Sequence, residues 1–187
     1  KDSSCKFNLY YHQPASKLNP KTQHHYLANL FSVIRQLHYS AKPAAQEKQK
    51  SLDLGIFING LPIFTAELKN PLTGQTVKNA TTQYTKHRDM HEPLFAFGRC
   101  LAHFAVDPNL VYFTTHLQED KTSFLPFNRG NNRGAGNPPS YRGFSTAYLW
   151  EQVWAKDSIL DLIQNFIYIV EEEIEDHRAD KKTISKI

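Results

Sequence analysis

Three residues with the chemistry of a phosphodiesterase lie around one short apolar segment of the chain. Asp53 opens the segment, and Glu67 and Lys69 close it as Glu67-Leu68-Lys69. Two carboxylates held close together repel each other, so loss of either is expected to leave the metal-free fold as stable as before or slightly more so. A divalent cation removes that conflict, and Mg²⁺ suits such hard oxygen ligands. Because the cation can activate a water that the lysine orients, the set predicts metal-dependent hydrolysis of a phosphodiester.

A similar spacing of acids and lysine occurs at a second place in the chain. Asp107 is followed by the segment 119–121, Glu-Asp-Lys. Those residues lie in polar turns, whereas Glu67 and Lys69 end the apolar run LPIFTA. Charged residues that end an apolar strand need an explanation, and charged residues in a turn do not. The structural alternative for the first set is a surface salt bridge between Glu67 and Lys69 at the edge of a sheet.

A β-hairpin around the Asn-Gly turn at 59–60 must bring the acids together. Asn-Gly between two β-rich runs is a strong hairpin signal. If Asp53 is to lie opposite Glu67, then Ile58 must pair with Pro62 around a three-residue loop. A strict two-residue turn shifts the register by one residue and places the acids on opposite faces. The sequence therefore predicts the wider loop or an equivalent β-bulge.

The remaining elements are expected to surround this hairpin in an α/β arrangement. Residues 1–20 are expected to form an extended arm, residues 21–170 one domain, and residues 171–187 a charged linker. Apolar residues at helical spacing predict a helix over residues 22–39, whereas residues 101–106 are either a strand or a buried helix. The further predictions are strands at 110–117 and 122–127 and helices at 77–89, 146–155 and 158–170.

Charge and cysteine content limit the classes of function. The formal net charge is +4 and the isoelectric point is near 9.0, which is compatible with a nucleic-acid partner. No run of about 18 apolar residues occurs, so we expect no membrane span. Cys5 and Cys100 are the two cysteines. They argue against a disulfide scaffold and are compatible with the reducing cytoplasm.

Residues 128–143, NRGNNRGAGNPPSYRG, predict a long loop without regular structure. The segment carries Arg129, Arg133 and Arg142 among Gly, Asn and Pro. Arginine in such a loop can bind the phosphates of DNA, and the alternative is that the loop docks against another domain. Because little regular hydrogen bonding is expected here, we predict that the segment is mobile.

The sequence around the acids resembles the N-terminal nuclease domain of the R subunit of type I restriction-modification enzymes. The hallmark of that family is an acid on one strand, an Asn-Gly-Leu-Pro turn, and then Glu-Leu-Lys-Asn-Pro. Asp53, residues 59–62 and residues 67–71 match it residue by residue. The resemblance runs from about Phe31 to Ile169 and includes the stretches EPLFAFGRCLAHFAVD, FLPFNRGNNRGAGNP and TAYLWEQVW. It is far more specific than the spacing of the charged residues alone.

The resemblance implies a fold and a metal site. The implied fold is the PD-(D/E)xK restriction-endonuclease-like core, a mixed β-sheet flanked by helices. Asp53, Glu67 and the backbone carbonyl of Leu68 are implied as Mg²⁺ ligands, and Lys69 as the group that orients the attacking water. Related folds often add a carboxylate from an N-terminal helix, but no acid occurs between residues 18 and 46. Either the two carboxylates and the carbonyl suffice, or an upstream acid has been lost.

The family also carries a Gln-x-x-x-Tyr motif one helix after the lysine. Gln83 fits its first position and is implied as a positioning group at the active site. The residue four positions on is His87, and Tyr84 lies beside the glutamine. His87 either hydrogen-bonds in place of the tyrosine or is an ordinary histidine on the helix surface. Tyr84 and His87 are therefore the candidates for the layer that supports the site.

The resemblance also implies partners for this chain. The R subunit contains an ATP-driven DNA translocase, but the chain has no G-x-x-x-x-G-K-[ST] segment, so ATP is implied only for the full-length subunit. The implied partners are double-stranded DNA, the motor domains of the same subunit, and the modification and specificity subunits, in the cytoplasm of a bacterium or archaeon. The implied function is a sequence-nonspecific, Mg²⁺-dependent DNA endonuclease. The alternative is a non-catalytic module that binds DNA or docks the motor onto the modification subunits.

Overall fold

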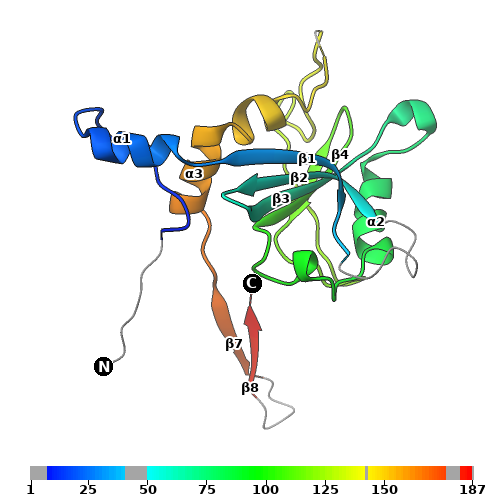
Figure 1. Cartoon of the computed structure of the whole chain (residues 1–187). Helices are drawn as coiled ribbons and strands as arrows, with labels where there is room; N and C mark the ends of the chain where they lie inside the picture. The colour runs from blue at the N-terminus through cyan, green and yellow to red at the C-terminus, as the bar shows by residue number, and fades with distance from the viewer. Residues whose placement is uncertain (1–7, 41–49, 142, 176–181, 187) are drawn as a thin grey trace.

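A six-stranded mixed sheet forms the centre of the fold (Figure 1). The computed structural model describes residues 8–40, 50–141, 143–175 and 182–186. The strands lie side by side in chain order as β1 (Phe31–His38), β2 (Ser51–Ile58), β3 (Leu61–Leu68), β4 (Ala102–Val106), β5 (Val111–Thr114) and β6 (Leu125–Pro126). Neighbouring strands are antiparallel except for β3 and β4, which are parallel. Residues 101–106, for which the sequence left two alternatives, thus contain a strand.

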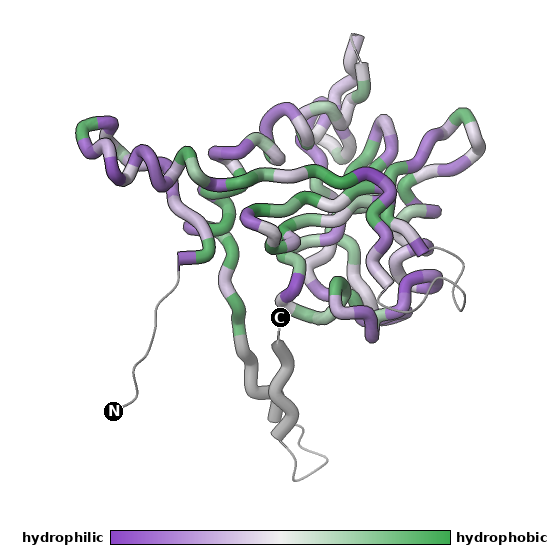
Figure 2. The backbone as a smooth tube through the Cα atoms, viewed as in Figure 1, coloured by the Kyte–Doolittle hydropathy of each residue, from purple (hydrophilic) through white to green (hydrophobic). Residues whose placement is uncertain are grey.

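Helices cover both faces of this sheet, which confirms the expected α/β class. Helix α2 (Val77–His87) connects β3 to β4, because a parallel pair needs a crossover, and it packs against Ala105. Helix α3 (Lys156–Asn165) and the short helix η3 (Leu149–Val153) pack on the other face, against Phe104. Strand β4 is buried along its whole length because both faces are covered. This arrangement is the mixed sheet flanked by helices of the PD-(D/E)xK core, and Figure 2 shows hydrophobic residues throughout its central strands.

The β2–β3 hairpin turns in two residues, not three. Asn59 and Gly60 have φ angles of 50° and 83°, the left-handed values of a type I′ turn. Ile58 therefore pairs with Leu61, and the predicted pairing of Ile58 with Pro62 is wrong. Asn-Gly is the preferred sequence for this turn because both residues adopt a positive φ at low cost.

A β-bulge then restores the register that the acids need. Ile63 is the extra residue on β3, where the pairing shifts by one position. Beyond the bulge, Leu54 pairs with Ala66, so the ladder places Asp53 opposite Glu67. The predicted alternative of an equivalent bulge is thus confirmed.

The predicted helix over residues 22–39 is wrong in its second half. Helix α1 (Pro20–Leu27) is short and begins after Asn19, whose side chain accepts two backbone N–H groups of the first turn. Strand β1 follows and pairs with β2 along its length. Apolar and β-branched residues such as Val33 and Ile34 suit an edge strand, so pairing with β2 prevails over the helical periodicity.

The described residues between β6 and η3 contain no helix or strand, as predicted, but residues 128–137 form a hydrogen-bonded turn within this loop. Asn131 and Gly134 exchange backbone hydrogen bonds of 3.0 and 2.8 Å. Asn137 donates to the backbone oxygen of Asn109 at 2.8 Å and thereby anchors this part of the loop to the turn before β5. Asparagine side chains supply hydrogen bonds that the glycine-rich backbone lacks, so this part of the loop is more ordered than its composition indicates.

The two ends of the described chain differ in how they meet the sheet. Near the N-terminus, Asn59 donates to the backbone oxygen of Leu9, so part of the predicted arm lies against the hairpin turn. Helix α3 ends at Asn165, and the predicted continuation through residues 166–170 is wrong, because this apolar stretch is largely exposed. Strands β7 (Glu171–Glu175) and β8 (Lys182–Lys186) pair with each other in a separate two-stranded sheet (Figure 1). Residues 1–7 of the predicted arm lie outside the described residues.

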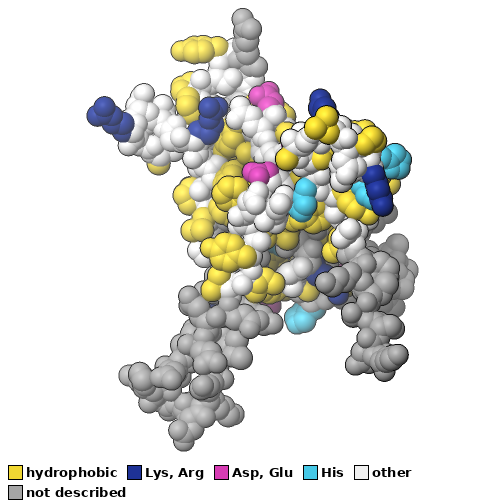
Figure 3. Space-filling view, turned by 90° about the vertical axis from the view of Figure 1, so that its left-hand side faces the viewer, with side chains coloured by type: hydrophobic (Ala, Val, Ile, Leu, Met, Phe, Trp, Pro, Cys, Tyr) yellow, Lys and Arg dark blue, Asp and Glu magenta, His cyan; other side chains and the backbone are white. Residues whose placement is uncertain are grey.

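Among the residues that the structure describes, no helix is long and apolar enough to cross a membrane. On the face drawn in Figure 3, hydrophobic side chains are widespread, and lysine and arginine side chains are scattered rather than gathered into one patch. A broad basic surface is therefore not a feature of this face.

Candidate active site at the open end of the β2–β3 hairpin

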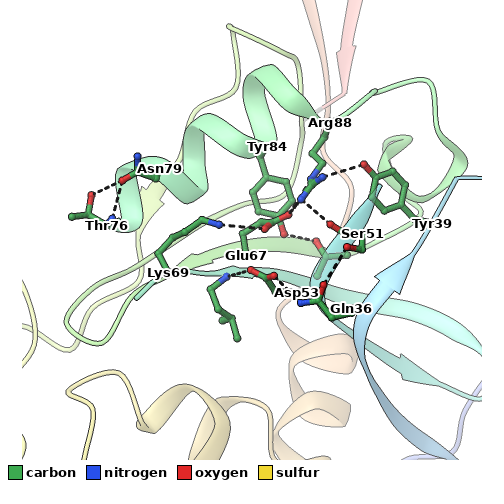
Figure 4. Close-up of polar contacts among 12 residues, drawn as sticks. Gln36, Tyr39, Ser51, Asp53, Glu67, Lys69, Thr76, Asn79, Tyr84 and Arg88 are labelled. Carbon is green, nitrogen blue, oxygen red and sulfur yellow. Dashed lines mark hydrogen bonds and ion pairs between the residues drawn. The ribbon is translucent and has the colours of Figure 1, made fainter. Parts of the chain in front are cut away.

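Glu67 is the central side chain of the candidate site. It lies near the end of β3, is completely buried, and accepts a hydrogen bond at Oε1 from Nε of Arg88 at 3.0 Å (Figure 4). Nη2 of Arg88 bonds the same oxygen. The other oxygen, Oε2, lies 3.8 Å from Nζ of Lys69 and has no hydrogen-bond partner among the described residues. The expected contact between Glu67 and Lys69 thus exists, but it is buried rather than a salt bridge on the surface.

Arg88 was not anticipated from the sequence. It follows the last residue of α2, and its guanidinium also donates to the backbone oxygen of Ser51 at 2.9 Å and to the hydroxyl of Tyr39 at 3.4 Å. Its position in the polar run KHRDM gives no periodic signal. The one available clue is physical: a glutamate at the end of an apolar strand needs a partner if it is buried.

Asp53 lies where strands β2 and β3 separate. The last pair of their ladder is Leu54 with Ala66, and the N–H of Leu68 then donates to Oδ2 of Asp53 at 2.8 Å. The carboxylate therefore lies against the backbone between Glu67 and Lys69, as Figure 4 shows. This places the two predicted acids, the Leu68 backbone and the predicted lysine at one end of the hairpin.

Gln36 holds the other oxygen of Asp53 and was also missed. Its Nε2 donates to Oδ1 of Asp53 at 3.3 Å, and its Oε1 accepts from the hydroxyl of Ser51 at 3.2 Å. Gln36 has a φ of 50° in the middle of β1, a conformation that glutamine rarely adopts within a strand. A single residue in this conformation leaves no trace in the hydrophobic pattern, so no sequence signal could have found it.

The charges around Glu67 act on its carboxyl in opposite directions. The pKa of Glu67 is raised to about 7, mainly by burial; the charge of Asp53 adds to the rise, and Arg88 and Lys69 oppose it. The pKa therefore remains high even though Arg88 forms an ion pair with the carboxylate. An additional cation nearby would stabilise the ionised form of this buried carboxyl.

The residues at this end of the hairpin fit a divalent cation. Oε2 of Glu67 is buried and accepts no hydrogen bond among the described residues, and Asp53 accepts the N–H of Leu68, the next residue along β3. Oxygen donors of this kind are the ligands that Mg²⁺ prefers. Within the described part of the chain, no group of three or more His, Cys, Asp or Glu side chains could hold a metal. A metal here would thus have two carboxylates and would rely on backbone or water oxygens for the rest.

The residues expected from the Gln-x-x-x-Tyr motif differ in burial and in their contacts. Tyr84 is completely buried, and its hydroxyl lies 2.8 Å from Oγ1 of Thr65, which in turn lies 2.7 Å from Nδ1 of His103. This buried network supports the strand that carries Glu67. His87, the last residue of α2, is exposed, which agrees with the alternative of a histidine on the helix surface. Gln83 is half-buried and makes no hydrogen bond among the described residues.

The second set of acids is structural. Asp107 is buried, and its Oδ2 accepts the N–H of Val77 at 2.8 Å, which caps the start of α2. Its Oδ1 accepts the N–H groups of Asn109 and Leu110 in the turn before β5. Residues 119–121 are exposed in a turn. These contacts explain Asp107 without any catalytic role.

The predicted DNA-binding arginines lie away from the acids in the chain and differ in environment. The guanidinium of Arg129 lies 5.8 Å from the centroid of the Tyr148 ring. Arg133 is exposed in the turn of residues 128–137, with a φ of 65°. Arg142 lies outside the described residues.

A mixed sheet with two acids and a lysine at the end of one hairpin defines the class of restriction-endonuclease-like domains. The family model described as the type I restriction enzyme R protein N terminus matches residues 13–122. This is more than half of the chain, and the chain belongs to that family. A search of the curated proteins found no match.

Proposed function

We propose that this domain is a Mg²⁺-dependent endonuclease that hydrolyses DNA without sequence preference. The observation that carries the proposal is the buried Oε2 of Glu67, which accepts no hydrogen bond among the described residues and faces Lys69, with Asp53 bonded to the next backbone N–H. Membership of the type I restriction R-protein family agrees with this chemistry. An ion pair with Arg88 alone does not explain why Oε2 is buried without a hydrogen bond.

Each residue has a defined role in this proposal. Asp53, Glu67 and the backbone carbonyl of Leu68 hold the cation. Bound Mg²⁺ supplies a Lewis acid that polarises the scissile phosphate. Lys69 directs its ammonium group to the attacking water and stabilises the negative charge that develops on the phosphate oxygens. Gln83, half-buried on α2, is the proposed positioning group on the helix side.

The same proposal includes the partners of the domain. A type I R protein works in a complex with other subunits and with DNA, so we propose the motor domains, the modification and specificity subunits and double-stranded DNA as partners. Arg129, Arg133 and Arg142 are proposed to bind phosphates rather than bases. ATP is proposed to act only on the motor of the full-length subunit. The proposed location of the complex is the cytoplasm.

Cleavage of supercoiled plasmid tests the proposal. Wild-type protein is expected to nick the plasmid with Mg²⁺ and to stop when the metal is chelated, while Lys69→Ala is expected to be inactive. Lys121→Ala is the matched control, because it removes a lysine from the structural set of residues 119–121. If the protein binds DNA but none of the divalent cations tested supports cleavage, the alternative of a non-catalytic docking module is correct.

A further inference from the structure

The two oxygens of Glu67 have very different surroundings. Nε and Nη2 of Arg88 both donate to Oε1, and Oε2 accepts no hydrogen bond among the described residues. When arginine and a carboxylate pair only for stability, the usual geometry is two parallel bonds, one to each oxygen. Here both donors converge on one oxygen, and the second oxygen is left buried on the side of Lys69. The pair is therefore arranged to leave one oxygen available.

Arg88 is itself fixed from several sides. Its side chain is 6% exposed, Nη2 donates to the backbone oxygen of Ser51, and the guanidinium lies 5.7 Å from the centroid of the Tyr39 ring. Nη1 lies 3.4 Å from the hydroxyl of the same tyrosine. Departure of Arg88 from Glu67 would leave a buried guanidinium without its carboxylate, which is strongly unfavourable. These contacts favour an arginine that stays in place when a metal binds.

We propose that Arg88 is a positioning residue, which holds Oε1 of Glu67 so that Oε2 alone is presented to the divalent cation. This inference rests on the proposed function, since it assigns Glu67 to a metal site. It gives Arg88 a role in the affinity for metal and none in contact with DNA or with the reacting atoms. The opposite role, a latch that must leave before metal binds, predicts the opposite sign of change when Arg88 is removed.

Titration of the metal-free whole chain with Mn²⁺ tests the inference without any cleavage. Removal of groups that orient metal ligands typically weakens metal binding by about 10- to 100-fold, and Arg88→Ala is expected to do so. Arg88→Lys keeps a positive charge beside Glu67 but cannot form the converging pair, so it is expected to weaken binding as well. Lys86→Ala, on the exposed surface of the same helix, is the control and is expected to bind Mn²⁺ as wild type does.

The outcomes distinguish the positioning role of Arg88 from the proposed metal site. Unchanged or tighter Mn²⁺ binding by Arg88→Ala overturns the positioning role, and tighter binding identifies a latch. Wild-type affinity in Arg88→Lys also overturns it, because charge alone then suffices. Arg88→Lys decides the question if Arg88→Ala does not fold. If wild type binds no Mn²⁺, or if Asp53→Ala leaves binding unchanged, the proposed metal site itself fails and the inference fails with it.

Discussion

Glu67 gives the metal-free protein a stability that depends on pH. Burial raises the pKa of its carboxyl to about 7, from an ordinary value of 4.5. Between these values the folded protein keeps a proton that the unfolded chain releases. The free energy of unfolding therefore falls as pH rises from about 4.5 to about 7. At about 1.4 kcal/mol for each pKa unit, the loss is at most roughly 3.5 kcal/mol.

Urea denaturation across this pH range measures the loss. The double variant Glu67→Gln/Arg88→Met replaces the buried pair with neutral groups, so its unfolding free energy is expected to lack the Glu67 contribution. The same pH dependence in wild type and in the double variant would show that other groups cause it.

The three proposed catalytic residues are expected to separate metal binding from catalysis. Asp53→Ala and Glu67→Ala each remove a carboxylate ligand, so both are expected to lose metal binding and cleavage. Lys69→Ala is expected to keep the metal and to lose about 10²- to 10³-fold in rate, as for other single electrostatic groups. Mn²⁺ titration and single-turnover cleavage measure the two properties. Wild-type metal binding by both carboxylate variants contradicts this assignment.

Because Arg88 pairs with Glu67, the expected effect of removing Glu67 on stability is the opposite of that expected from repulsion between the acids alone. Glu67→Ala leaves the buried guanidinium without its partner, so it is expected to destabilise the metal-free fold by about 3–5 kcal/mol. Asp53→Ala removes the acceptor of hydrogen bonds from Leu68 and Gln36 but also relieves repulsion with Glu67, so it is expected to cost at most about 1 kcal/mol. Urea denaturation at about pH 8, where Glu67 is ionised, compares them. If the two variants are equally stable, the ion pair of Glu67 with Arg88 does not contribute more to stability than the hydrogen bonds of Asp53.

At the scale of residues, the sequence predicts the side chains with catalytic chemistry but not those that hold them in place through long-range hydrogen bonds. Asp53, Glu67 and Lys69 were expected together because an apolar hairpin and a family motif both point to them. Arg88 and Gln36 complete the site through long-range contacts, which no local pattern records. The structure thus adds the residues that hold the acids.

At the scale of elements, Asn59 fixes the hairpin that aligns the acids. Its side chain accepts the N–H of Leu30 at 2.7 Å and donates to the backbone oxygen of Leu9 at 2.9 Å. Asn59→Ala is expected to destabilise the fold by about 1–3 kcal/mol because these groups lose their partner. Asn132→Ala is the matched control, because Asn132 is exposed and has a similar φ of 48°. An equal loss of stability in both variants, by thermal denaturation, would show that only the turn conformation matters.

The elements were predictable where short-range signals agree with pairing. The Asn-Gly turn and the alternative of a bulge followed from the register that the acids require. The helix over residues 22–39 failed in its second half, because β1 forms through pairing with β2, a contact that the local periodicity does not contain. The loop over residues 128–143 was predictable from its composition, but the hydrogen bonds that order residues 128–137, such as those of Asn137, were not.

At the scale of the whole molecule, DNA binding is expected to be weak and governed by salt. The formal net charge is only +4, so a few phosphate contacts are expected. Each contact contributes about 0.9 to the slope of log K against log salt, so Arg133→Ala is expected to lower the slope by about that amount. Fluorescence anisotropy on unrelated duplexes measures slope and preference. An unchanged slope removes Arg133 from the interface, and a preference above about tenfold, or roughly 1.4 kcal/mol, shows base recognition.

The location of a bound metal tests the central claim most directly. Crystals soaked in Mn²⁺ give an anomalous signal that places the ion without reference to activity. We predict one peak or more at the open end of the β2–β3 hairpin, bonded to Asp53, to Oε2 of Glu67 and to the carbonyl of Leu68. Saturating Mn²⁺ that leaves this end of the hairpin empty, or binds only elsewhere on the molecule, contradicts the assignment of the active site.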